Sequence, residues 1–331
     1  MSMKKHILKL FAAPAAQAAL FSSSRKDTVG GQALIEGVMM RSKERIAWAV
    51  RKPDGDAVIE SYPFVSITKK SRLWGIPVVR GVINLFESLN WGYKALSRSA
   101  DIAIEEEEKA AGKDTSAGGK KKKSFMDWVV NALIFIAALA FTFALFKYAP
   151  MWTVSLFLNI NESPVLFNLI EGIIQIGLFL IYMSLFSLWG DMRRVFEYHG
   201  AEHKTIFAYE DGKDLTVDNI DAYGTIHPRC GTSFLILVAI CSILISSTID
   251  SLYIQYFGGF INIFHRLAVH IPLIPFIAGL SYEFLKLSDR FQHWPIVGFL
   301  IKPGLWLQKI TTRKPDAMQI GIAVKALEAS L

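Results

Sequence analysis

Long apolar runs dominate the last two thirds of the chain. They cover residues 128–148, 172–190, 232–249 and 267–287. Each run is long enough to cross a hydrocarbon core of about 30 Å as a helix. A buried helix of a soluble protein could show one such run, but the recurrence along one chain predicts an α-helical membrane domain. We place this domain at 126–310.

The last of these runs is the most irregular, because prolines and ionisable side chains interrupt it. These residues are His270, Pro272, Pro275, Glu283 and Lys286. Ionisable residues inside a span are costly and are usually retained for function. The apolar stretch 253–264 just before this run predicts a segment that lies in the membrane interface.

The composition supports the membrane class. Hydrophobic residues make up 52% of the chain, including 23 Phe and 8 Trp, which is more than the core of a soluble domain requires. The two cysteines, Cys230 and Cys241, cannot form a disulfide framework. They suit a reducing compartment or burial in the membrane.

The placement of basic residues predicts the orientation in the membrane. Lys120–Lys123 precede the first run, and segments 148–165 and 250–265 contain no Lys or Arg. Basic residues return in 191–231 and after the last run. By the positive-inside rule, both termini and 191–231 face the cytoplasm of a multi-pass protein in the cell (inner) membrane. Topology thus explains most of the net charge of +7, and specific recognition of a nucleic-acid sequence is not required.

The part before the membrane domain predicts a cytoplasmic unit over 27–100. RIAWAVRK and DAVIESYPF read as β-strands that flank the turn Pro53-Asp54-Gly55. Apolar residues then recur at helical spacing over 77–98, which predicts an amphipathic helix in the bilayer interface. The charge blocks that follow predict a mobile linker over 101–125.

The two ends of the chain predict simpler elements. Residues 1–26 resemble a secretion signal, but Lys9 and Pro14 interrupt the apolar stretch, so we expect an interfacial tail. HWPIVGFLIKPGLWLQKI is too short and too rich in proline to span, and it reads as an interfacial hairpin. Residues 311–331 predict a capped cytoplasmic helix.

The motif HGAEH at 199–203 carries the candidate chemistry. On a helix, His199 and His203 lie one turn apart on one face, where they could hold one zinc or other divalent ion. Glu202 could then act as general base. H-x-x-E-H is the inverted zinc motif of the inverzincin proteases. Gly200 and Ala201 would let another element approach the helix closely.

A third metal ligand is needed, and the sequence offers several. Our order of preference is Glu283, because a carboxylate inside a span is costly, and then His227 and Cys230. The last two lie in TIHPRCGTSF, directly before the third run. Further carboxylates that could serve are Glu197 and Glu36.

Structural roles remain open for the same residues. The histidines could form a polar cluster at a helix end, and Cys230 could be an inert thiol. Glu283 could pair with Lys286 or Arg290, and Glu36 could cap a turn.

Several of these motifs together resemble one family. They are GGQALIEGVMMR, RGVINLFESL, EYHGAEHKTIFAYE, HPRCGTSFLILV, AGLSYEFLKLSDR and TTRKPDAMQIGIAVKALE. The chain is similar over 27–331 to the YqhQ-like family of bacterial polytopic membrane proteins. The resemblance implies a membrane protein labelled as a metal-dependent enzyme. It carries His199, Glu202, His203, His227 and Cys230 over as candidate site residues.

The leading hypothesis is a zinc hydrolase at the cytoplasmic membrane face that acts on a membrane-associated peptide or lipid. The first alternative is a non-enzymatic accessory factor in membrane-protein biogenesis or translation, with helix 77–98 and the linker bound to a ribosome or translocon. The second is a small transporter, suggested by His270 and Glu283 in the last run.

Overall fold

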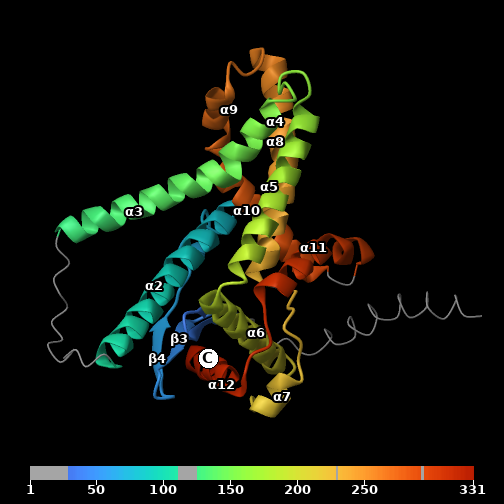
Figure 1. Ribbon diagram of the computed structural model, residues 1–331. Helices are drawn as coiled ribbons and strands as arrows, with labels where there is room; N and C mark the ends of the chain where they lie inside the picture. The colour runs from blue at the N-terminus through green and yellow to red at the C-terminus, as the bar shows by residue number, and fades with distance from the viewer. Residues whose placement is uncertain (1–28, 111–124, 229, 292–293) are drawn as a thin grey trace, which may run out of the picture.

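The chain builds a bundle of long helices beside a small sheet module (Figure 1). The computed structural model describes residues 29–110, 125–228, 230–291 and 294–331. The predicted tail 1–26 and residues 111–124 of the predicted linker lie outside the described residues.

The bundle contains the predicted spans. Its helices are α3 (Phe125–Phe143), α4 (Ala149–Ser155), α5 (Pro164–Phe186), α8 (Gly231–Phe257), α9 (Ile263–His270) and α10 (Leu273–Arg290). A π-helical turn, Ala144–Tyr148, joins α3 to α4. Within the described residues, 3 helical stretches are long and apolar enough to cross a membrane, and α9 with α10 makes a fourth if the bent pair is one span. These helices fit a membrane protein.

The span boundaries differ from the predicted ones. The apolar stretches are Ala132–Ser155, Pro164–Phe186 and Phe234–Phe257, followed by Ile263–His270 with Leu273–Ser288, bent by 49°. The predicted interfacial segment 253–264 is partly wrong, because α8 continues through Phe257 before Gly258 ends it with φ +83°. The bend follows from Pro272, which caps α10 and cannot donate a backbone hydrogen bond.

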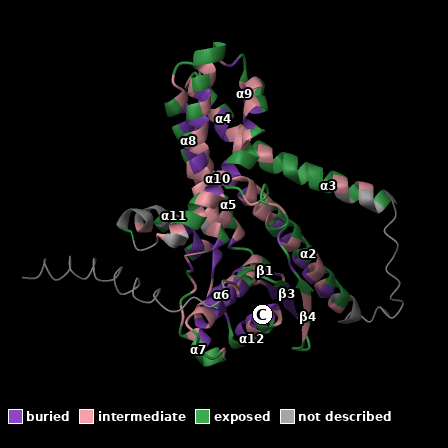
Figure 2. Ribbon diagram, turned by 180° about the vertical axis from the view of Figure 1, so that it is seen from behind, coloured by how far each residue is buried: buried purple, intermediate pink, exposed green. Residues whose placement is uncertain are grey.

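Helix α3 exposes apolar side chains along its length, whereas α6 and α12 at the sheet module are largely buried (Figure 2). Leu133, Ile134 and Phe135 are 60%, 62% and 64% exposed. An apolar surface of this extent needs a non-aqueous environment or a partner to cover it.

A buried network of charges joins the candidate spans. Arg266 on α9 donates to Asp250 on α8 at 2.9 Å and to Glu171 on α5 at 2.9 Å. Lys147 donates to the other oxygen of Glu171 at 2.6 Å, and His270 Nε2 lies 2.7 Å from Asp250. Arg266 is 2% exposed and Asp250 is fully buried. The two carboxylates and two permanent cations balance, so the helices are held together without a net buried charge.

The sheet module is an antiparallel meander of β1 (Gly30–Leu34), β2 (Gly37–Arg41), β3 (Arg45–Arg51) and β4 (Ala57–Pro63). Strands β3 and β4 confirm the predicted pair around the Pro53-Asp54-Gly55 turn. The GGQALIEGVMMR motif forms the additional hairpin β1–β2.

Both faces of the sheet are covered. Val38, Met40 and Ala49 pack against α6 (Gly190–Glu210) and α12 (Ala317–Ser330). The alternate residues Met39 and Trp48 face the opposite way, where α2 (Val79–Ala110) packs over them. The period of two along β2 and β3 therefore places the sheet between two helical layers.

Helix α2 confirms the predicted helix at 77–98 and extends it into the predicted linker. It begins after Val78, whose φ is +68°. Gly81 of α2 lies against the backbone of Gly279 on α10, so the sheet module and the bundle meet along α2. The stripe of Phe86, Leu89 and Tyr93 stays exposed at 64%, 60% and 68%.

The C-terminal part of the chain forms two helices, of which one differs from the sequence prediction and one agrees with it. The predicted interfacial hairpin is wrong, because Pro295–Thr311 forms a single helix, α11, with Pro303 inside it. Helix α11 packs against α8, and this packing compensates for the hydrogen bond that the proline cannot donate. Helix α12 confirms the predicted capped helix, since Asp316 and Gln319 form a capping box.

The segment between α11 and α12 crosses α6 at close range. The Arg313 N–H donates to Phe196 O at 2.9 Å, and the Arg313 carbonyl lies directly over Gly200. Gly200 thus permits the close approach of another segment to α6, as the sequence predicts. A short helix, α7 (Val217–Asp221), follows α6 and completes the module.

We predict that Arg266→Met destabilises the bundle, because it leaves Asp250 and Glu171 buried without their shared cation. The expected loss is about 3–5 kcal/mol, measured by thermal unfolding of the full chain in detergent. Arg193→Met is the matched control, because Arg193 is 63% exposed and pairs only on the α6 surface. Its expected change is below about 1 kcal/mol. Equal losses in the two variants would contradict a structural role for the network.

We also predict that Gly200→Ala costs about 1–3 kcal/mol of unfolding free energy, because the added methyl group collides with the Arg313 carbonyl. Gly321→Ala on α12 is the control, since nothing lies within 4 Å of a methyl group there. That variant should be neutral or stabilising. Thermal unfolding of both variants measures the difference, and an unaffected Gly200→Ala protein would refute the close crossing.

Candidate metal site

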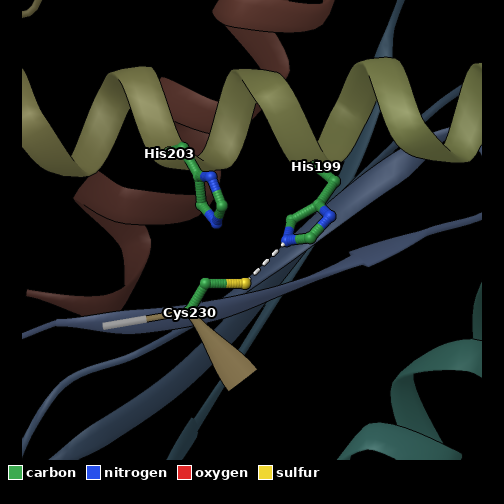
Figure 3. Close-up of side chains that lie close together, drawn as sticks. All are labelled: His199, His203 and Cys230. Carbon is green, nitrogen blue, oxygen red and sulfur yellow. Dashed lines mark hydrogen bonds between the residues drawn. The ribbon is translucent and has the colours of Figure 1, made fainter. Parts of the chain in front are cut away.

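Helix α6 presents the HGAEH motif, as the sequence predicts. It runs from Gly190 to Glu210 with Asp211 as its C-cap, and Gly212 follows with a φ of +68°. The rings of His199 and His203 lie on one face with centroids 4.4 Å apart. Both rings point toward Cys230 (Figure 3).

Cys230 completes a three-residue cluster. It caps the N-terminus of α8, where its Sγ accepts from the Thr232 N–H at 3.4 Å. His199 Nε2 lies 3.2 Å from Sγ, and one ligand atom each from His199, His203 and Cys230 lies within 4.8 Å of the others. Two imidazoles and a thiolate are a ligand set that zinc uses.

Backbone carbonyls orient both imidazoles. His199 Nδ1 lies 2.8 Å from Thr311 O, and His203 Nδ1 lies 2.5 Å from Thr225 O. A carbonyl can only accept, so each Nδ1 carries the proton and each Nε2 keeps its lone pair. Metal-binding histidines show this arrangement, because the outer hydrogen bond selects the tautomer and holds the ring.

The protonation states also suit metal binding. Burial holds the pKa of His203 below its ordinary value, so the ring is neutral. Burial raises the pKa of the Cys230 thiol, whereas the contacts of its Sγ with the Thr232 hydroxyl and N–H lower that pKa. His203 Nε2 is buried and makes no hydrogen bond to the described residues. A metal ion would supply the missing partner.

Glu202 lies beside the cluster in full burial. Burial raises its pKa to about 8, opposed by the nearby His199 and supported by Cys230. Its Oε2 has no hydrogen-bond partner among the described residues. Gly31 of β1 donates its backbone N–H to this carboxylate, and a methyl group on Gly31 would lie 2.8 Å from it. Buried carboxylates with a perturbed pKa and an unpaired oxygen gather at functional sites.

His227 lies next to the cluster but outside the three-residue group. Its ring centroid is 5.6 Å from that of His203, and its Nε2 is 3.8 Å from Glu210. Gln308 on α11 binds the His227 backbone on both sides, accepting from N at 2.7 Å and donating to O at 2.8 Å. This clamp fixes the loop that carries Cys230.

Glu283, our first choice for the third ligand, does not join the group. Arg80 on α2 forms a two-pronged ion pair with it, with Nε at 2.7 Å from one oxygen. Glu283 therefore forms a salt bridge, as the structural alternative predicts, although its main partner is Arg80 and not Lys286 or Arg290. The order of preference is corrected: among the described residues, Cys230 is the one that approaches both histidines.

The remaining carboxylates are engaged elsewhere. Glu36, in the β1–β2 turn with φ +52°, pairs with Arg194 and accepts from the Tyr198 hydroxyl at 3.2 Å. Glu197 accepts from Gln319 at 3.0 Å on α12. Both fasten α6 to its neighbours.

Sequence reasoning missed the residues that position the ligands. Thr225 and Thr311 act through backbone carbonyls, which any residue type could supply, so the sequence has no signal for them. The paired glycines of GGQAL were a usable signal, since Gly31 is where β1 approaches Glu202.

Comparisons with known proteins agree with the motif resemblance. The model of a family described as "Protein of unknown function (DUF1385)" matches residues 76–331. The chain is 30% identical over 310 residues to the uncharacterized protein YqhQ of Bacillus subtilis (strain 168), which covers 91% of this chain and 92% of that protein. No solved structure matches. The family match contains every residue of the three-residue cluster as well as Glu202, and the chain belongs to the YqhQ-like family of proteins of unknown function.

Proposed function

We propose that the chain is a membrane-bound, metal-dependent hydrolase whose zinc or similar divalent ion is held by His199, His203 and Cys230. The observation that carries the proposal is the pair of carbonyl contacts on the histidine rings. They leave both Nε2 lone pairs facing the Cys230 thiol. A purely structural histidine cluster has no need to direct two lone pairs at one point.

The number of ligands favours a catalytic centre. Structural zinc sites close four positions with protein ligands, whereas catalytic sites use three and keep one open. Here the group contains three protein ligands within the described residues. Such an ion, when bound, supplies a Lewis acid and makes water acidic enough to react near neutral pH.

Glu202 is suited to move the proton. Its carboxylate neighbours His199 and Cys230, and its free oxygen has no competing donor among the described residues. With a pKa of about 8 the group is mostly protonated near neutral pH, and a bound cation would favour the ionised form, which can accept a proton from water and pass it to a leaving group. Gly31 supports it from the β1 side through its backbone N–H.

The position of the site favours a substrate from the membrane. Cys230 begins α8, the helix that contains the span Phe234–Phe257. The distribution of Lys and Arg favours the cytoplasmic side for this end of the helix. We therefore place the reaction at the cytoplasmic face of the cell membrane.

We predict one zinc or other divalent ion per chain in the purified protein, measured by elemental analysis. His199→Ala/His203→Ala should lose it, and Cys230→Ser should weaken binding because a hydroxyl is a poor zinc ligand. His265→Ala is the control, since its ring contacts Tyr253 and Phe260 at the other end of α8. An equal metal content in wild type and the double variant would refute the site.

We predict that Glu202→Gln keeps the metal but lowers hydrolysis by about 10²–10⁴-fold, because the amide cannot accept the proton. The measurement is product release from labelled membrane lipid and peptide substrates, followed by mass spectrometry. Glu197→Gln on the same helix is the matched control, since that carboxylate faces Arg193 and Gln319. Full turnover by Glu202→Gln would remove Glu202 as the base.

A further inference from the structure

A cavity of about 710 Å³ lies between the first strands of the sheet, α2, and the site-facing ends of α8 and α10. Its walls include Gly31 on β1, Trp91 on α2, Phe234 on α8 and Tyr282 on α10. Figure 1 shows α2 running beside both α10 and the sheet, so the cavity occupies the junction of the two parts of the molecule. The volume is in the range of sites for small organic ligands.

The cavity adjoins the candidate metal site across Gly31. Gly31, which lines it, touches the Glu202 carboxylate from the other side. Pro228 and Gly231 line it as well, and they belong to the loop that holds His227 and Cys230. A ligand in the cavity would therefore have one end at Gly31, with the Glu202 carboxylate on the other side of that residue.

The charge of the lining selects an anion. Its ionisable groups include the basic residues Arg41, Lys43, Lys69 and Lys286, and no Asp or Glu occurs among the described lining residues. Glu87 lies 3.8 Å from Arg41 and offsets part of this charge. The net charge of the lining remains positive, and the partial positive charge at the N-terminus of the 27-residue helix α8, at Gly231, adds to it. Phosphate groups suit such a site.

The rest of the lining selects an apolar tail. Met39, Leu85 and Leu285 line the cavity together with the aromatic side chains. Helices α8 and α10 on one wall are candidate membrane spans, which favours a ligand that comes from the bilayer. A free sugar phosphate would leave this apolar wall unused.

We propose that the cavity binds an anionic phospholipid, with its phosphate among the basic residues and its chains on the apolar wall. This inference rests on the proposed function and names its substrate class. Hydrolysis would break one ester bond of the lipid: the hydroxyl of water goes to the acyl carbon or phosphorus, and the proton goes to the leaving alcohol.

The test compares lipid binding by the full chain in detergent, using native mass spectrometry with phosphatidylglycerol and phosphatidylcholine as probes. Wild type should prefer phosphatidylglycerol. Lys69→Gln/Lys286→Gln should weaken phosphatidylglycerol binding about tenfold and phosphatidylcholine binding much less, because the choline cation already offsets the attraction between the lysines and the phosphate. Both lysines are exposed, so the fold should survive, which thermal unfolding verifies.

The matched control is Lys213→Gln/Lys325→Gln, which removes the same charge from exposed positions outside the cavity lining. It should bind phosphatidylglycerol as wild type does. An equal loss in both double variants would reduce the effect to overall charge and overturn the proposal. Displacement of the lipid by millimolar inorganic phosphate would overturn the choice of a lipid in favour of a soluble anion.

The metal-site variant separates this inference from the proposed hydrolase. His199→Ala/His203→Ala changes no cavity-lining residue and should keep the lipid preference. Lipid preference in wild-type protein that contains no metal would support the cavity and reject the hydrolase. Stoichiometric metal without any preference for phosphatidylglycerol would reject the cavity assignment alone.

Discussion

Two backbone carbonyls fix the tautomers of the histidine rings in the candidate metal site. Thr311 O and Thr225 O accept the Nδ1 protons of His199 and His203, and the two Nε2 atoms are thereby left to face Cys230. The first contact exists only because the chain after α11 crosses α6 at Gly200, where a side chain would block it. The close crossing of α6 thus fixes the tautomer of His199, and this tautomer is the one that metal binding would require.

The site also depends on how the sheet module and the bundle are joined. The histidines belong to α6, which packs under the sheet, whereas Cys230 begins α8, which belongs to the bundle. Arg266, Asp250 and Glu171 hold α8 to its neighbours through a neutral buried network. Gln308 then clamps the loop before Cys230 from α11. The candidate metal ligands therefore come from two parts of the molecule that are positioned by separate interactions.

The sequence could predict features that are local. The spacing of His199 and His203 needs only one helical turn, and the apolar runs need only their own length, so both predictions are confirmed. The third ligand depends on tertiary contacts. Glu283 looked functional because a carboxylate in a span is costly, yet Arg80, 203 residues earlier, neutralises it. Cys230 looked like an inert helix cap, and it does cap α8, but the fold also brings it to both histidines. Pro303 suggested a hairpin at the C-terminus, whereas packing against α8 keeps α11 continuous.

Glu202 is the residue that favours a reactive site over a purely structural one. A structural metal site gains nothing from an additional buried carboxylate, and burying one without a full set of partners costs free energy. Here the carboxylate is buried beside the ligands, its pKa is raised to about 8 and one oxygen has no partner in the described part of the chain. Gly31 has no side chain to displace it, and the same residue forms a wall of the cationic, partly apolar cavity. The buried carboxylate therefore lies beside the candidate ligand cluster and, across Gly31, beside the cavity, which is the position that the proposed hydrolysis requires of a base.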